Sequence, residues 1–182
     1  MTYDDYLAFE ERSDTKHEYL RGEVLAMSGG TPEHAALASS FTIALGTALR
    51  GKPCRIFSSD LRVRVAETDL STYPDLTVVC GRLDIAPDDR HATTNPIVVV
   101  EVLSDSSEAY DRGAKFAHYR HLASLREYVL VAQDAPRVEV YRRNESGRFE
   151  LFEFAAGETV ELASIGARVL VDELYANPLD AS

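Results

Sequence analysis

Two nearly uninterrupted runs of β-branched and apolar residues constrain the fold of this chain most. They cover residues 73–80 and 97–103, and few side chains within either run are polar. A strand exposed on one face alternates apolar and polar residues, whereas a strand covered on both faces is apolar almost throughout. The two runs therefore predict strands in the middle of a sheet, with other elements packed against both of its faces.

Helical spacing of apolar residues predicts two longer helices around these strands. One follows a Thr31 cap and Pro32 and spans residues 33–50, and the other spans residues 109–122. A short peripheral helix opens the chain, and residues 82–96 are predicted to be a solvated loop. Further strands are predicted at 17–27 (a hairpin), 54–65 (with one solvated face), 128–132, 137–142, 149–154 and 165–170. This order predicts an α/β fold with a central mixed β-sheet flanked by helices and an N-terminal hairpin.

Length and composition exclude several other classes of protein. The 182 residues fit one domain, 1–182, and 45% hydrophobic with 27% charged residues is a globular composition, unlike that of a disordered chain, a collagen or a disulfide scaffold. Neither Cys54 nor Cys80 has a metal-finger or Cys-x-x-Cys spacing, and we interpret both as small buried hydrophobic residues. The first residues are acidic and no apolar run is long enough to span a membrane, which predicts a cytoplasmic, reducing location and no membrane partner.

Glu101 places a carboxylate in the middle of the most apolar strand of the chain. An ionised carboxylate is costly to bury without a partner, so Glu101 is expected to be protonated, paired with a cation or bound to a metal. The alternative is an inward glutamate that an arginine or backbone groups satisfy.

Asp75 follows Pro74 at the start of the preceding buried strand. If the two strands are neighbours, Asp75 and Glu101 reach one point near the edge of the sheet. Two carboxylates at one point repel each other unless a hard cation lies between them, and their oxygens suit Mg²⁺ or Mn²⁺. The alternative is that Asp75 only caps a turn after Pro74.

Lys115 lies on the second predicted helix, on the same stripe as Tyr119 and Leu122. This spacing directs its aliphatic stem toward the sheet. A lysine beside two metal-binding carboxylates can stabilise charge on a phosphate or orient the attacking water. The alternative is an exposed ion pair with Asp111, four residues earlier.

Asp75, Glu101 and Lys115, in this order, resemble the signature of the PD-(D/E)xK nuclease superfamily. The surrounding sequence is similar to the Uma2 branch of that superfamily, also called DUF820 and described as a restriction endonuclease family. The similarity extends over roughly residues 2–143. Seven blocks carry it: Glu18–Val24, Pro32–His34, Ser59–Val63, Pro74–Asp75, Val100–Ser104, Asp111–Phe116 and Glu127–Val131.

The resemblance implies a restriction-endonuclease-like core, with metal ligation by Asp75 and Glu101 and a catalytic role for Lys115. The superfamily usually carries its lysine two residues after the strand glutamate, where this chain has Leu103. Lys115 therefore inherits the role from the following helix. The first long helix of such proteins often adds a polar group, which makes His34 a further catalytic candidate.

Alternatives for the remaining polar residues stay open. Glu33 is a second candidate beside His34, and the two could equally form a solvated capping pair. We interpret Glu23 as a hairpin charge and Asp60 as a strand-edge acid, although both lie in blocks that resemble the family.

The net charge of −11 opposes non-specific coating of nucleic acid, but the charge is unevenly distributed. Residues 112–148, which contain Lys115, hold eight basic and four acidic residues, and the segments on either side are net acidic. A smaller basic stretch comprises Arg50, Lys52, Arg55, Arg62 and Arg64. Both stretches could flank a groove for DNA, although solvated helix and strand faces would give similar counts.

We therefore predict a Mg²⁺- or Mn²⁺-dependent endonuclease that hydrolyses phosphodiester bonds in DNA. Asp75 and Glu101 would hold the metal and Lys115 would assist the attacking water. DNA binding would be weak, local and dependent on metal. One alternative is a catalytically inactive nuclease fold that serves as a binding or assembly module, and another is a small phosphoester hydrolase. Superfamily members often pair, so a homodimer through apolar edge strands also stays open.

Overall fold

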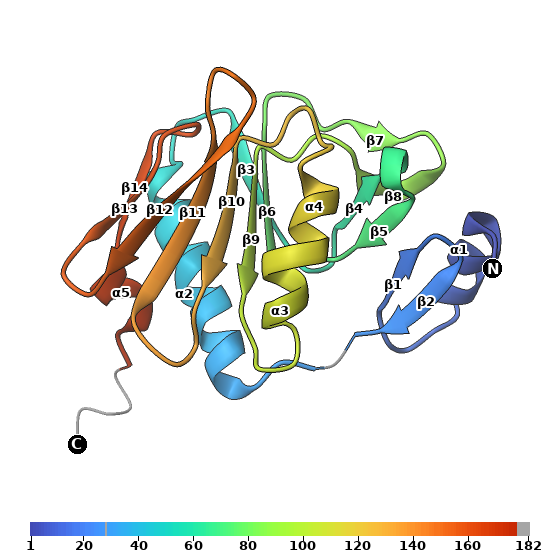
Figure 1. The fold of residues 1–182 in the computed structure, drawn as a ribbon, viewed down its shortest axis with the longest axis horizontal. Coiled ribbons are helices and arrows are strands. Elements are labelled where there is room, and N and C mark those ends of the chain that lie inside the picture. The colour runs from blue at the N-terminus through green and yellow to red at the C-terminus, as the bar shows by residue number, and fades with distance from the viewer. Residues whose placement is uncertain (28, 178–182) are drawn as a thin grey trace.

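The computed structural model describes residues 1–27 and 29–177, which form two six-stranded sheets, a two-stranded sheet and several helices (Figure 1). In the central sheet the strand order is β12-β11-β10-β9-β6-β3, with β9 and β10 parallel and the other pairs antiparallel. These strands are β3 (Cys54–Ser58), β6 (Leu76–Cys80), β9 (Val98–Val102), β10 (Glu127–Val131), β11 (Arg137–Arg143) and β12 (Phe149–Ala155). The predicted central mixed sheet is confirmed, with β6 and β9 inside it.

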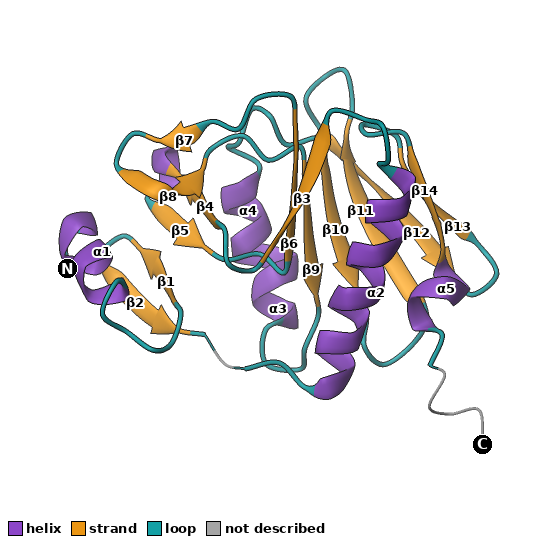
Figure 2. Cartoon of the chain, turned by 180° about the vertical axis from the view of Figure 1, so that it is seen from behind, coloured by secondary structure: helices purple, strands orange, loops and turns teal. Residues whose placement is uncertain are grey.

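Helices cover both faces of the central sheet, as Figure 2 shows. On one face lies α2 (Pro32–Ala48), which Thr31 caps by accepting a hydrogen bond from the backbone N–H of His34. On the other lie α3 (Glu108–Tyr110), the π-helical segment η2 (Asp111–Lys115) and α4 (Phe116–Tyr119). Within the described residues, no helix is long and apolar enough to cross a membrane.

The faces of β9 determine where Glu101 points. Val98 and Val100 pack in the same hydrophobic core as α2, whereas Val99 packs in the core that contains Tyr119 of α4. Because side chains alternate along a strand, Glu101 faces the layer formed by α3, η2 and α4. The segment that carries Lys115 lies in that layer.

The second sheet has the order β2-β1-β5-β4-β8-β7 and lies on the side of the N-terminus (Figure 1). Its strands are β1 (His17–Leu20), β2 (Glu23–Ala26), β4 (Arg62–Val65), β5 (Leu70–Thr72), β7 (Ile85–Ala86) and β8 (Asp89–Thr93), with α1 (Tyr3–Glu10) and the 3₁₀ turn η1 (Ala66–Thr68) nearby. The opening helix and the β1–β2 hairpin confirm the predictions. Two predictions are wrong: residues 54–65 divide into β3 and β4 of different sheets, and the predicted loop 82–96 contains β7 and β8.

The arginines of β4 are buried, which contradicts the predicted solvated face. Arg62 Nε donates to Asp89 Oδ2 at 2.7 Å, and Arg64 Nη2 donates to Asp69 Oδ1 at 2.9 Å. Both arginines have residue exposures of 5%. Their charges are neutralised inside the protein, so these two residues do not flank a DNA groove.

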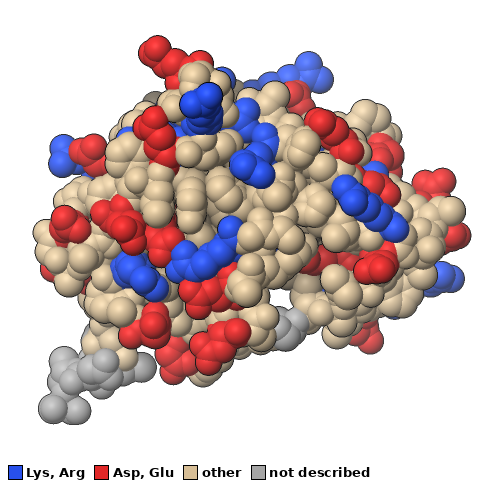
Figure 3. Space-filling view, in the orientation of Figure 1, with Lys and Arg blue, Asp and Glu red and all other residues tan. Residues whose placement is uncertain are grey.

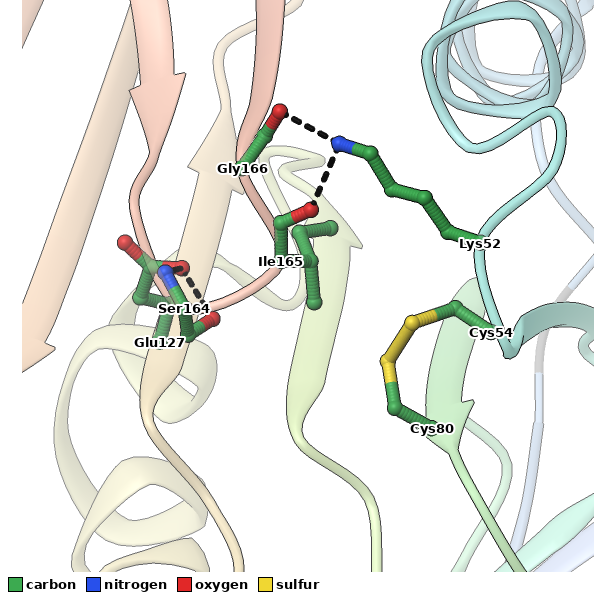
Figure 4. Close-up of a disulfide and its surroundings, with 7 residues drawn as sticks. All are labelled: Lys52, Cys54, Cys80, Glu127, Ser164, Ile165 and Gly166. Carbon is green, nitrogen blue, oxygen red and sulfur yellow. Dashed lines mark hydrogen bonds between the residues drawn. A yellow bond between two sulfur atoms is a disulfide. The ribbon is translucent and has the colours of Figure 1, made fainter.

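At the C-terminal end of the described chain, β13 (Thr159–Leu162) and β14 (Ala167–Leu170) form a hairpin that α5 (Val171–Tyr175) follows. The sequence predicted only a short strand at 165–170. Lys52 ties this hairpin to the body of the protein by donating to the backbone carbonyl oxygens of Ile165 at 2.9 Å and Gly166 at 2.6 Å (Figure 4).

A disulfide joins Cys54 of β3 to Cys80 of β6 (Figure 4). The two residues are directly opposite each other in the antiparallel pair, with their Cα atoms 4.0 Å apart. This corrects the interpretation of both cysteines as merely small buried hydrophobic residues. The disulfide covalently links edge strand β3 to its neighbour β6. The cytoplasmic location stays a prediction.

Candidate active site

Strand register brings Asp75 and Glu101 together. Strands β6 and β9 are antiparallel, with Leu76 opposite Val100, so Asp75 lies opposite Glu101 just beyond the start of β6. The backbone N–H of Asp75 lies 3.4 Å from Glu101 Oε2, and the backbone N–H of Val102 donates to Asp75 Oδ2 at 2.7 Å. The two residues therefore lie side by side at one end of these inner strands, as expected for neighbouring strands.

Lys115 points into the protein and meets three carboxylates. Its Nζ lies 2.9 Å from Glu101 Oε1, 3.1 Å from Glu18 Oε1 and 3.5 Å from Asp111 Oδ1. Lys115 has an exposure of 5%, and Asp111 is buried as well. The alternative of an exposed Lys115–Asp111 pair is therefore wrong.

The π-helical turn η2 sets the direction of Lys115. Arg112 fastens the turn to β11, because its Nη2 donates to Glu139 Oε1 at 2.9 Å. From β10, the Tyr128 hydroxyl donates to the backbone carbonyl of Asp111 at 3.0 Å. Such wide turns are frequent at functional sites, and this one is anchored at its first two residues.

His34 reaches the same place from the first turn of α2. Its Nε2 lies 3.2 Å from Asp75 Oδ2, and both side chains are 19% exposed. The hydrogen bond to Asp75 raises the pKa of His34, and partial burial opposes that shift without cancelling it. The neighbouring Glu33 is exposed. The structure therefore brings together Asp75, Glu101, Lys115 and His34, and Asp75 and His34 form its solvent-facing side.

The other polar candidates lie elsewhere. Glu23 is exposed on β2, and the carboxylate of Asp60 pairs with Lys16 at 2.7 Å. None of these contacts joins the Asp75–Glu101 cluster.

The structure adds to the cluster three residues that were not predicted as site residues: Glu18, Asp111 and Tyr119. The Tyr119 hydroxyl donates to Glu101 Oε1 at 2.9 Å, and the two carboxylates contact Lys115. Glu18 is the acid of a short strand that is otherwise mostly aromatic and apolar. Asp111 stands one helical turn before Lys115. These two features of the sequence could have indicated that Glu18 and Asp111 belong to the site.

The cluster carries more negative than positive charge. Asp75, Glu101, Glu18 and Asp111 share it with one ammonium, Lys115, and the imidazole of His34. Burial raises the pKa of Glu101 to about 8, and Asp111 and Asp75 add to the shift while Lys115 opposes it. Burial acts to lower the pKa of Lys115, but Glu101, Glu18 and Asp111 outweigh it and hold that pKa well above its ordinary value.

The donor set fits a small divalent cation that retains much of its water. Within residues 1–27 and 29–177, no three His, Cys, Asp or Glu side chains form a ready metal-binding group. Asp75 and Glu101 nevertheless offer adjacent carboxylates, and Mg²⁺ in proteins is commonly held by one or two carboxylates together with waters and substrate phosphates. The surplus negative charge of the cluster favours such a cation.

Some basic side chains of the net positive segment are paired with glutamates of the protein. In residues 112–148, Arg142 Nε donates to the buried Glu127 at 2.8 Å, and Arg112 binds Glu108 and Glu139. On the face shown in Figure 3, lysines and arginines are interspersed with acidic residues. Arg120, Arg126 and Arg148 of the same segment are exposed, so this pairing reduces the number of cations open to a partner without removing them all.

Three known proteins share most of this chain's length. The chain is 38% identical to the protein slr1290 of Synechocystis sp., over 96% of this chain and 91% of that protein. It is 32% identical to sll1609 of the same organism, over 89% and 91% of the two chains. A crystal structure described as a "putative nuclease belonging to DUF820" from Anabaena variabilis has a TM-score of 0.77 and 20% identity, over 96% of this chain and 97% of the other. At that identity the likeness shows a shared fold.

The family comparison covers the candidate site as well as both sheets. The model of the Uma2 family, whose description is "Putative restriction endonuclease", matches residues 3–170. That range includes every residue of the cluster around Asp75 and Glu101. The chain belongs to the Uma2 family and has its restriction-endonuclease-like fold.

Proposed function

We propose that this protein is a divalent-metal-dependent endonuclease that hydrolyses phosphodiester bonds in DNA. The observation that carries the proposal is the convergence of Asp75, Glu101 and Lys115 at the end of two central strands. The description of the family as a restriction endonuclease supports the reaction class.

Each side chain has a distinct role in this proposal. Asp75 and Glu101 would hold the cation, which when bound supplies Lewis-acid chemistry to the phosphate. Because its pKa is raised, Lys115 keeps its proton and supplies a positive charge beside the phosphate site rather than acting as a base. His34, which is partly exposed beside Asp75, would contact the substrate or hold a proton at Nε2.

The test is cleavage of supercoiled plasmid in the presence of Mg²⁺ or Mn²⁺. The wild-type protein should nick the plasmid, and Asp75→Asn should lose activity by about a hundredfold or more. Asp60→Asn, which changes an exposed aspartate away from the cluster, should retain activity. Equal nicking by wild type and Asp75→Asn would overturn the mechanism.

A non-catalytic binding or assembly module is the second candidate. It is favoured by the lack of a ready three-residue metal group among the described residues. Calorimetric titration with Mn²⁺ separates the two: the nuclease proposal requires binding at millimolar metal that Asp75→Asn removes, and the module requires none. Nucleotide monoesters tested beside DNA would reveal a small phosphoester hydrolase.

A further inference from the structure

Glu18 reaches the candidate site from the N-terminal hairpin. Strand β1 pairs with β5, with Tyr19 opposite Ser71 and Leu20 opposite Leu70, so Glu18 continues this register toward Thr72. The Thr72 hydroxyl donates a hydrogen bond to Glu18 Oε1. Thr72 stands three residues before Asp75. This pairing therefore joins the N-terminal hairpin to the segment that carries the Asp75 carboxylate.

The packing of Tyr19 fixes the direction of Glu18. The ring of Tyr19 lies 5.1 Å from that of Tyr3 and 5.2 Å from that of Tyr6, in an aromatic cluster with α1. Adjacent residues of a strand point to opposite faces, so Glu18 is directed away from this cluster and toward Lys115. A register slip of one residue would bury the tyrosine where the carboxylate now lies.

The contacts of Lys115 divide into two kinds. An ammonium has three N–H donors, and Lys115 has three carboxylate neighbours. Glu18 and Asp111 contact no other part of the proposed metal site, whereas Glu101 lies beside Asp75. Two carboxylates thus hold the ammonium from within the protein, and the third contact directs it toward the place where a phosphate would bind.

We propose that Glu18 is a positioning residue, which holds the Lys115 ammonium against Glu101 so that the N-terminal hairpin completes the active site. The expected effect on catalysis rests on the proposed function, whereas the positioning itself rests on the Glu18–Lys115 contact. Glu18 is 8% exposed, and its acceptor oxygen lies 3.1 Å from Lys115 Nζ. Its negative charge, added to that of Glu101, restricts rotation of the lysine side chain and so keeps the ammonium in place.

The test compares Glu18→Gln with Glu23→Gln, a matched change on the exposed part of the same hairpin. Glu18→Gln should lower kcat for plasmid nicking by about tenfold or more and leave KM and Mn²⁺ affinity within about twofold. Glu23→Gln should match wild type. A loss confined to KM, or unchanged kcat, would overturn the positioning role.

A second measurement tests the Glu18–Lys115 contact independently of enzymatic activity. NMR of ¹⁵N-lysine-labelled protein should show a slowly exchanging Lys115 ammonium in wild type, assigned by its absence in Lys115→Met, and faster exchange in Glu18→Gln. If Glu18→Gln does not fold, Thr72→Val removes the hydroxyl that anchors Glu18 and should speed exchange in the same direction. Unchanged exchange in the folded variant overturns the inference. An inactive wild type with this exchange pattern would refute the proposed nuclease and leave the Glu18 contact standing.

Discussion

Glu101 is the residue whose ionisation depends most on its neighbours. Burial removes the water that would stabilise its charge, and Asp75 and Asp111 repel that charge further. Lys115 and the Tyr119 hydroxyl both contact Oε1 and favour the ionised form. Without a metal, the balance leaves Glu101 holding a proton at neutral pH.

The stability of the metal-free protein should fall as pH rises from about 5 to about 8. In that window Glu101, whose pKa is about 8, is protonated in the folded protein but ionised in the unfolded chain, where 4.5 is ordinary, so the folded state binds more protons. His34 acts in the same direction, because its raised pKa contributes stability that is lost as pH rises through the folded value. Urea unfolding across this range measures the slope. Glu101→Gln should flatten it, and an equal slope in that variant would contradict the assignment.

Metal binding at pH 7 should release a proton. A cation held by Glu101 requires the ionised carboxylate, so binding displaces the proton that burial retains there. Titration of Mn²⁺ in two buffers with different ionisation enthalpies gives the number released, which should approach one. The number should be near zero in Glu101→Gln; a zero value in wild type would contradict the assignment of a protonated Glu101 as a metal ligand.

For three residues of the site, local patterns together with the resemblance to the Uma2 family were enough to predict that they converge. Glu101 stands out in an apolar strand, Asp75 begins the neighbouring one, and Lys115 lies on a helical stripe. Glu18 was not predictable in this way, since its contact with Lys115 depends on how a distant hairpin docks onto β5. Nothing in the local sequence specifies that docking.

Among the elements, the strands that contain buried charged residues, β4 and β8, were the hardest to predict. Alternating arginine and valine in β4 predicted a solvated face, but both arginines are buried and donate hydrogen bonds to the buried Asp89 and the partly exposed Asp69. Strand β8 begins with that buried Asp89, and its polar composition suggested a loop. In both places charge pairing between separate elements overrides the local pattern.

Reduction of the disulfide should destabilise the protein. The bond spans a sequence separation of 26, for which the loss of unfolded-state entropy corresponds to about 3.5 kcal/mol. Urea unfolding with and without dithiothreitol, at matched pH, measures the difference. Cys54→Ser with Cys80→Ser should be insensitive to dithiothreitol; an equal free energy of unfolding for oxidised and reduced wild type would contradict the prediction.

At the scale of the whole molecule, the acidic surface should limit DNA binding. In the positive segment Arg112 and Arg142 are paired with glutamates, and on the face in Figure 3 basic and acidic residues are interspersed. We expect the slope of log K against log salt to be shallower than about −4, which corresponds to contact with only a few phosphates. Fluorescence anisotropy with a labelled duplex in Ca²⁺ tests this. A steeper slope would require a larger basic surface.

The cluster around Lys115 also has a consequence for how the chain folds. Its members come from β1, α2, the start of β6, β9 and η2, which are far apart in the chain and meet only through non-local pairing. Closing such loops costs entropy before any contact repays it, which slows the pairing of distant strands. In refolding from urea, far-ultraviolet helical signal should therefore return before protection of the Lys115 ammonium. The cluster around Lys115 would therefore be among the last parts of the protein to form during folding.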